Sequence, residues 1–307
     1  MGAPRKPVGI AGVNAALLDA FAIHLATHAP HTRNAYLRDV RQLCAMAGEA
    51  PLARVSRAQL MRFVATLHAQ GLSGRSLARA LSAWRAFYRF LIEHDRSLVE
   101  DPTAGIRAPK SARRLPSALS PDEAARLVTI AGDDPLAVRD RALFELAYSS
   151  GLRLSELAGL DVGGCDPASG EVRVLGKGSK ERIVPVGAAA RDALVRWIAV
   201  RGGHAADGEA AMFTGRGGRR LSPRSIQQRL AGWAIRQGLS RHVHPHMLRH
   251  SFASHVLQSS GDLRAVQEML GHASIASTQV YTHLDFQALA KVYDAAHPRA
   301  KRKRSTK

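Results

Sequence analysis

Six polar residues of this chain have the types and spacing that chemistry on a phosphodiester needs: Arg153, Lys177, His246, Arg249, His272 and Tyr281. A phosphodiester under attack gains negative charge on its non-bridging oxygens, so catalysis depends on cationic donors that are already in place. An arginine offers a planar fork to two such oxygens, and a histidine can donate or accept a proton. His246 and Arg249 are three residues apart, so a helix would point an acid/base group and an anion-binding group the same way.

The histidines around Arg249 make a poor metal site. These histidines are His242, His244, His246 and His250, and no carboxylate or thiolate lies near them in the sequence. The arginine among them would repel a divalent cation. The two cysteines, Cys44 and Cys165, are 121 residues apart and are expected to be free thiols. We therefore expect no metal and no cofactor.

The common enzyme motifs are missing from the sequence. It contains no Gly-x-x-x-x-Gly-Lys-[Ser/Thr], no His-Glu-x-x-His, no Gly-x-Ser-x-Gly and no Rossmann glycine fingerprint. Nucleotide hydrolysis and zinc proteolysis are therefore excluded as interpretations.

The order and spacing of the six residues resemble those of a known family. Arg153 lies in Gly151-Leu-Arg-Leu-Ser-Glu156, Arg249 precedes His272 by 23 residues, and Tyr281 follows nine residues later. This set resembles that of the tyrosine recombinases, the phage-integrase family, whose catalytic residues are Arg, Lys, His-x-x-Arg, His or Trp, and Tyr. A residue of the right type is present at every position.

The resemblance implies a mechanism. Tyr281 would attack the scissile phosphorus, leaving a 3′-phosphotyrosyl link and a free 5′-hydroxyl, without ATP. The two arginines would stabilise the negative charge, and Lys177 would protonate the departing 5′-oxygen. His246 would assist proton transfer near the tyrosine, and His272 would donate to a phosphate oxygen. Glu156, one helical turn from Arg153, would orient that arginine or its neighbours.

The stretch from Ser260 to Ala300 further resembles the bacterial subgroup that resolves chromosome dimers. The resemblance implies a double-stranded DNA site, a Holliday junction intermediate, and a tetramer of two copies of this chain with two of a related recombinase. A DNA-translocase activator at the septum is a further expected partner.

The elements that must position these residues are mainly helical. Residues 14–94 follow a helical pattern, with Ser56 and Ser73 as starts of two helices. In the second of these, one face is apolar and the opposite face is purely basic. We expect the basic face to contact a phosphate backbone; its residues are Arg75, Arg79, Arg85 and Arg89.

Charge and composition divide the chain into two cationic halves. The 307 residues carry 44 Lys+Arg and 25 Asp+Glu, a net charge of +19, which favours a polyanionic partner. Residues 1–108 hold 14 basic and 7 acidic residues, and residues 109–307 hold 30 and 18. We expect a helical DNA-binding domain over 1–108, a basic linker over 109–116, a catalytic domain over 117–298 and a basic tail over 299–307. The resemblance implies a two-domain, C-shaped clamp.

The second half should be helical with one β-hairpin. Ser120-Pro-Asp-Glu123 predicts a capped helix start, and residues 171–186 alternate around Gly-Lys-Gly-Ser, which predicts a hairpin with Lys177 at its tip. Residues 201–220 should be irregular. Further helices are predicted over 135–148, from 154, from 223, and at about 245–258, 262–270, 274–280 and 286–295. In the last, Phe286, Leu289 and Tyr293 form a stripe that we expect to dock either on a neighbouring protomer or within the chain.

Three alternatives remain open at this point. A type IB topoisomerase shares the Arg, Lys, His and Tyr chemistry, and an arm-binding phage integrase would need an extra N-terminal domain. A non-enzymatic helical DNA-binding regulator explains the charge but not Tyr281. No run of about 18 apolar residues and no apolar signal segment exist, so we expect a cytoplasmic protein without a membrane contact.

Overall fold

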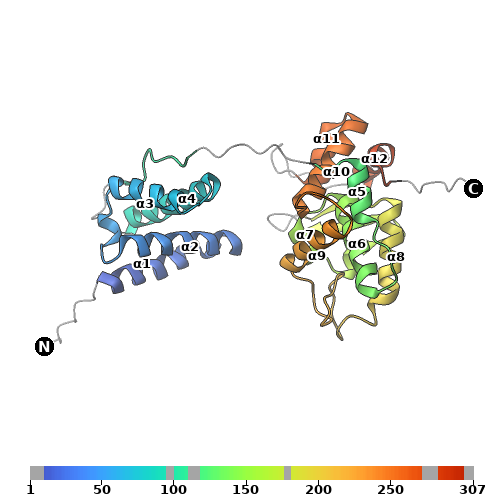
Figure 1. The fold of residues 1–307 in the computed structure, drawn as a ribbon, viewed down its shortest axis with the longest axis horizontal. Helices are drawn as coiled ribbons and strands as arrows, with labels where there is room; N and C mark the ends of the chain where they lie inside the picture. Colours follow the sequence, from blue (N-terminus) through green and yellow to red (C-terminus); the bar gives the residue numbers. More distant parts are fainter. Residues whose placement is uncertain (1–9, 95–99, 110–117, 176–180, 272–282, 301–307) are drawn as a thin grey trace, which may run out of the picture. The chain divides into compact units, whose positions relative to one another are not determined.

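The computed structural model describes residues 10–94, 100–109, 118–175, 181–271 and 283–300, with side chains described from Asn14 in the first helix and from Leu289 in the last. The chain forms two compact units that divide between Arg113 and Arg114 (Figure 1). Several predicted features lie outside the described residues: the hairpin tip with Lys177, the predicted helix at 274–280, His272, Tyr281 and most of the predicted linker.

The first unit is helical, as the sequence predicts. Its helices are α1 (Ile10–His24), α2 (Pro30–Ala47), α3 (Arg57–Ala69) and α4 (Gly74–His94), with short 3-10 turns at Leu25–Thr27 and Leu52–Arg54. Ser56 starts α3 with a capping box shared with Gln59. The apolar face of α4 forms the centre of the core, where Trp84 and Tyr88 are fully buried.

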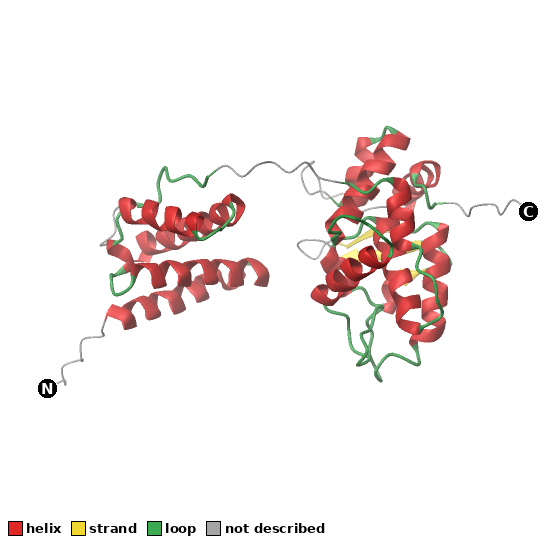
Figure 2. Cartoon of the chain, in the orientation of Figure 1, coloured by secondary structure: helices red, strands yellow, loops and turns green. Residues whose placement is uncertain are grey.

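The second unit combines helices with a small sheet (Figure 2). Its helices are α5 (Pro121–Val128), α6 (Pro135–Ser150), α7 (Leu154–Gly159), α8 (Ala188–Arg201), α9 (Pro223–Arg236), α10 (Pro245–Ser260), α11 (Leu263–Leu270) and α12 (His283–Ala296). The predicted capping box at Ser120 and Glu123 starts α5. The long helix α6 is buried along most of its length and packs against α8 and α10. This buried scaffold ends at Gly151, where the candidate site begins.

The predicted hairpin is present and has one additional strand. β2 (Glu171–Leu175) pairs antiparallel with β3 (Glu181–Pro185), with Val174 opposite Arg182. The short strand β1 (Cys165–Asp166) pairs with the other edge of β2 and was not predicted. A second difference is the helix α8, which the sequence analysis does not predict. Its buried stripe has the i, i+3, i+4, i+7 spacing of an amphipathic helix, with Ala190, Ala193, Leu194 and Trp197.

The last helix packs within its own chain. Leu289 and Tyr293 of α12 are buried beside Phe252 of α10, and the Tyr293 hydroxyl lies 2.6 Å from the Ser149 hydroxyl oxygen. Leu289 and Tyr293 therefore pack within their own chain, which is one of the two arrangements expected for this helix. Neither side chain is free to dock on a neighbouring protomer in this structure. Among the described residues, no helix is both long and apolar enough to span a membrane.

Candidate active site

The turn between α6 and α7 places Arg153. Gly151 ends α6 in the left-handed conformation, at φ +57°. Arg153 then starts α7, and its backbone N–H donates to Glu156 Oε2 at 2.7 Å. The Arg153 side chain turns back to the same carboxylate, with Nη1 2.9 Å from Oε1. Glu156 thus caps α7 and pairs with the Arg153 side chain.

Arg249 reaches the same turn from α10. Its apolar neighbours Leu248 and Phe252 anchor the helix in the core, and the half-buried guanidinium donates from Nη1 to Gly151 O at 2.6 Å. A Cβ at Gly151 would lie 2.4 Å from Phe252 Cδ1, so only glycine allows this close packing. The turn and the helix are therefore fitted to each other.

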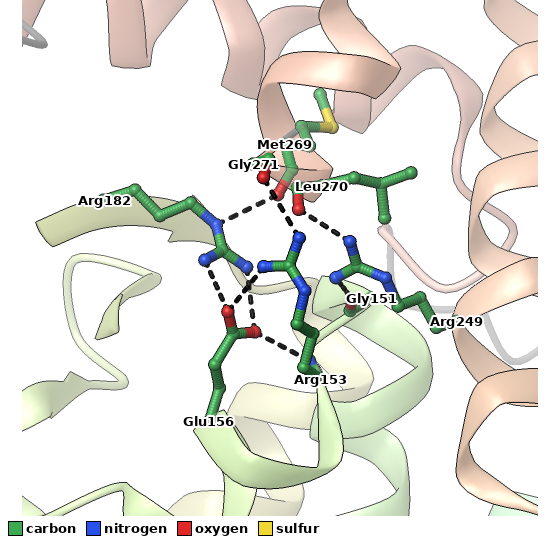
Figure 3. Close-up of polar contacts among 8 residues, drawn as sticks. All are labelled: Gly151, Arg153, Glu156, Arg182, Arg249, Met269, Leu270 and Gly271. Atoms are coloured by element: carbon green, nitrogen blue, oxygen red, sulfur yellow. Dashed lines mark hydrogen bonds and ion pairs between the residues drawn. The ribbon is translucent and has the colours of Figure 1, made fainter. Parts of the chain in front are cut away.

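Three arginines converge on the last turn of α11 (Figure 3). Arg182 Nε donates to Met269 O at 3.4 Å, Arg249 Nη2 to Leu270 O at 2.7 Å, and Arg153 Nη2 to Gly271 O at 3.0 Å. The last carbonyls of a helix have no partner within the helix, and cations near them also interact favourably with the helix dipole. Three successive carbonyls thus each receive a different guanidinium.

The electrostatics of this group favour an anion. Burial by itself would raise the pKa of Glu156, but hydrogen bonds from Arg182 and from the Arg153 backbone lower it to about 2. Burial and the neighbouring Arg153 lower the pKa of Arg249 to about 10, which leaves it protonated at neutral pH. Three guanidiniums and one carboxylate give this buried group a net charge of +2. The single negative charge of a phosphodiester would neutralise half of it, and the remaining charge favours the negative charge that grows during attack.

Two family models match the chain. The model described as "Phage integrase family" matches residues 117–288, more than half of the chain, and "Phage integrase, N-terminal SAM-like domain" matches residues 18–95. The chain belongs to the phage integrase family, the tyrosine recombinases. It is thus a site-specific recombinase, a DNA-binding enzyme that breaks and rejoins DNA, which decides against the non-enzymatic regulator.

Curated relatives resemble this recombinase over most of their length. "Tyrosine recombinase XerC" of Xanthomonas campestris pv. campestris (strain B100) is 56% identical over 279 residues, covering 90% of this chain and 85% of the relative. The protein of the same description from Pseudomonas aeruginosa (strain LESB58) is 55% identical over 293 residues, covering 93% and 96%.

Solved recombinase structures share the fold at low sequence identity. A lambda integrase tetramer bound to a Holliday junction matches with a TM-score of 0.69 at 19% identity, covering 92% of this chain and 86% of the other. XerH bound to difH substrate, in a pre-cleavage complex, matches with a TM-score of 0.65 at 22% identity, covering 90% and 82%.

The structure brings together only part of the predicted residue set. Arg153 and Arg249 meet at the end of α11, and Glu156 pairs with Arg153. His246 is exposed on α10 and makes no hydrogen bond to Arg249 among the described contacts. His272 and Tyr281 follow Gly271 in the sequence, so the segment that carries them starts at this arginine group.

The sequence interpretation missed Arg182. The signal was present, because Val172, Val174 and Val184 mark the inward face of the predicted hairpin and Arg182 falls on that face. Its exposed fraction is 7%, so this arginine needs a buried anionic partner, and Glu156 is that partner.

The predicted basic face of α4 is partly engaged within the first unit. Arg79 Nε lies 2.7 Å from Asp39 Oδ2 on α2, and Arg85 Nη2 donates to Ile106 O at 2.5 Å. Among the contacts described for this unit, Arg75 and Arg89 make no ion pair or side-chain hydrogen bond, and both are exposed. Contact with phosphates remains a prediction for all four arginines, and the exposed Arg75 and Arg89 are its best candidates.

The described residues offer no grouping of three or more His, Cys, Asp or Glu side chains that could hold a metal ion. In the histidine cluster, successive ring centroids of His242, His244 and His246 are 6.3 Å apart. Partial burial and the neighbouring histidines lower the pKa of His244.

Proposed function

We propose that this recombinase is a XerC-type enzyme that cuts and rejoins a dif-type chromosomal site through a 3′-phosphotyrosyl intermediate and a Holliday junction, and so resolves chromosome dimers. The observation that carries the chemistry is the convergence of Arg153 and Arg249 at the end of α11, next in sequence to the segment with His272 and Tyr281. Identity of 55–56% to the two XerC relatives supports the choice of subgroup.

The two guanidiniums have donors to spare for a phosphate. Each arginine has five N–H groups. Among the described residues, Arg153 donates two of them, to Glu156 and to Gly271 O, and Arg249 donates two, to Gly151 O and Leu270 O. The remaining N–H groups can therefore bind the non-bridging oxygens of the scissile phosphate and stabilise the charge that grows there.

The proposed reaction conserves bond energy. The Tyr281 oxygen forms a bond to phosphorus while the bond to the 5′-oxygen breaks. His246 assists removal of the tyrosine proton, Lys177 gives a proton to the leaving 5′-oxygen, and His272 donates to a phosphate oxygen. The free 5′-hydroxyl of a partner strand then reverses the step, so no ATP or metal is needed.

The proposed assembly contains two copies of this chain and two of a XerD-like recombinase, closed as clamps around the duplex. A DNA translocase at the septum would act as its activator, and the site of action would be the cytoplasm. The cationic character of both halves of the chain supports binding of a duplex by both units.

Covalent trapping tests the proposed function. A nicked dif-type duplex, from which the cleaved strand end diffuses away, is mixed with the protein in EDTA and, in parallel, with added XerD-like partner. We expect a denaturation-resistant protein–DNA adduct that Tyr281→Phe abolishes while binding is retained. Tight binding without an adduct under both conditions would contradict the proposal. Exchange between two sites, rather than relaxation of supercoils alone, separates it from a topoisomerase.

A further inference from the structure

Arg182 joins three separate parts of the arginine group. It lies on β3, with both terminal nitrogens on the Glu156 carboxylate at 2.7 and 2.9 Å and Nε at Met269 O. Its stem lies against Gly271, where an added Cβ would be 3.1 Å from Arg182 Cδ and Nε. One side chain therefore connects the strand, α7 and the end of α11 (Figure 3).

Arg182 and Arg153 share the Glu156 carboxylate. Oε1 accepts Nη1 of both arginines, whereas Oε2 accepts Arg182 Nη2 and the backbone N–H of Arg153. Glu156 is almost completely buried, so an oxygen that loses one donor must find another. Arg153 is the donor within reach. Without Arg182, we expect the Arg153 guanidinium to turn further onto Glu156 and away from a phosphate.

The same side chain also contacts the end of α11, which precedes the tyrosine-bearing segment in the sequence. Met269 O is the first of three successive carbonyls held by guanidiniums, and Gly271 is the last described residue before His272. Arg182 also follows Lys177 by five residues. Through its bonds, Arg182 links β3, α7 and the end of α11. These elements carry or adjoin all the groups of the proposed reaction except His246 and Arg249, which lie on α10.

We propose that Arg182 is a positioning residue for DNA cleavage, which holds Glu156 so that Arg153 keeps its donors free for the scissile phosphate, and which fixes the end of α11. This inference rests on the proposed function. Arg182 itself is too buried to bind the phosphate, with 7% of its side chain exposed, and both of its terminal nitrogens donate to Glu156. Its effect on the rate is exerted through Arg153 and the backbone at Met269.

The test is single-turnover cleavage of the nicked duplex at saturating protein. The variants are Arg182→Met and Arg182→Lys, with Arg264→Met as the control. Arg264 lies on α11, and its ion pair among the described residues is an exposed one with Glu268 at 3.0 Å. We expect Arg182→Met to lower the cleavage rate constant about 100-fold, as displacement of a reacting group by about 1 Å does. DNA affinity and the fraction of protein that reacts should stay near those of the wild type, and Arg182→Lys should recover part of the rate.

A purely structural role gives a different result. Partial unfolding would lower the amplitude of the reaction and leave the rate constant of the folded fraction unchanged, which would overturn the proposal. If Arg182→Met does not fold, Arg182→Lys, which keeps the charge, must still show the lowered rate constant. If the wild type forms the adduct and either folded variant cleaves at the wild-type rate, the proposed role of Arg182 is refuted. The proposed function is not affected by that result.

A double variant tests whether Arg182 acts through Glu156. We expect Glu156→Gln with Arg182→Met to cleave about as fast as the slower single variant, because both changes disturb the same contact to Arg153. Multiplication of the two losses would contradict the inference. No adduct with the wild type would instead refute the proposed function, and the inference with it.

Discussion

Gly151 has two roles in the site that no other residue type could combine. Its carbonyl accepts the Arg249 guanidinium, and its missing side chain leaves room for Phe252. The left-handed backbone at this position adds to the requirement for glycine. Both roles fix where Arg249 lies.

We expect Gly151→Ala to destabilise the protein and to slow cleavage. The clash with Phe252 costs about 1 to 3 kcal/mol, in addition to about 1 kcal/mol for alanine in the left-handed conformation. The matched control is Gly261→Ala, which has a similar φ of +67° with no atom within 4 Å of the added Cβ. Urea unfolding and single-turnover cleavage measure both effects. Equal losses of stability in the two variants would show that the Phe252 contact is unimportant.

The low pKa of Glu156 predicts how its contribution depends on pH. In the folded state the pKa is about 2, below the ordinary value of 4.5, so the stabilisation is complete above pH 4.5 and is lost as the pH falls toward 2. The expected pH-dependent part is about 3 kcal/mol. The difference in unfolding free energy between wild type and Glu156→Gln should therefore narrow from pH 6 to pH 3. A constant difference would contradict the ion pairs described here.

Helices α6 and α9 are joined through one buried carboxylate. Asp140 of α6 is fully buried and accepts Arg139 Nη2 at 2.7 Å, Arg229 Nε at 2.7 Å and Trp233 Nε1 at 2.7 Å. Because α9 also contacts α7, this carboxylate helps to hold the helix that carries Arg153.

We expect Asp140→Asn to lower the unfolding free energy by about 3 to 5 kcal/mol, because it leaves the buried Arg139 and the partly buried Arg229 without their counter-charge. The control is Asp161→Asn, whose pair with Arg220 is about half exposed and should contribute less than about 1 kcal/mol. Denaturant unfolding of both variants decides the point. If both variants lose less than about 1 kcal/mol of unfolding free energy, the Asp140 cluster does not contribute the stability expected of it.

Elements with local signals were predictable, and long-range contacts were not. The caps at Ser56 and Ser120 and the stripe of α4 depend on residues within a few positions of one another, so the sequence predicts them. The two-residue strand β1 has no periodicity to detect and forms only because β2 offers an edge. Glu156 meets Arg182 across 26 positions, and Arg153 meets Gly271 across 118. Only the folded chain reveals the group of three arginines.

The two units of the molecule have separate cores and the same sign of charge. Each hydrophobic cluster is made within one unit, and the net charges of residues 1–108 and 109–307 are +7 and +12. When cationic side chains of both units neutralise phosphates, the condensed counterions of the DNA are released into the solution, so binding should weaken steeply with salt.

We expect the affinity for a dif-type duplex to fall by about 10³-fold or more between about 50 and 200 mM salt, the behaviour of proteins with many phosphate contacts. Fluorescence anisotropy titrations with wild type and Tyr281→Phe should give the same slope, because the nucleophile contributes chemistry rather than charge. An affinity that is independent of salt would argue against binding through the cationic surfaces.

The identity of the covalently linked residue tests the account most directly. The trapped protein–DNA adduct is digested with protease and nuclease, and the peptide that carries the nucleotide is sequenced by mass spectrometry. We predict a 3′-phosphonucleotide on Tyr281, in the segment that follows the carbonyls held by Arg182, Arg249 and Arg153. A nucleotide on any other residue would contradict the proposed arrangement of the active site.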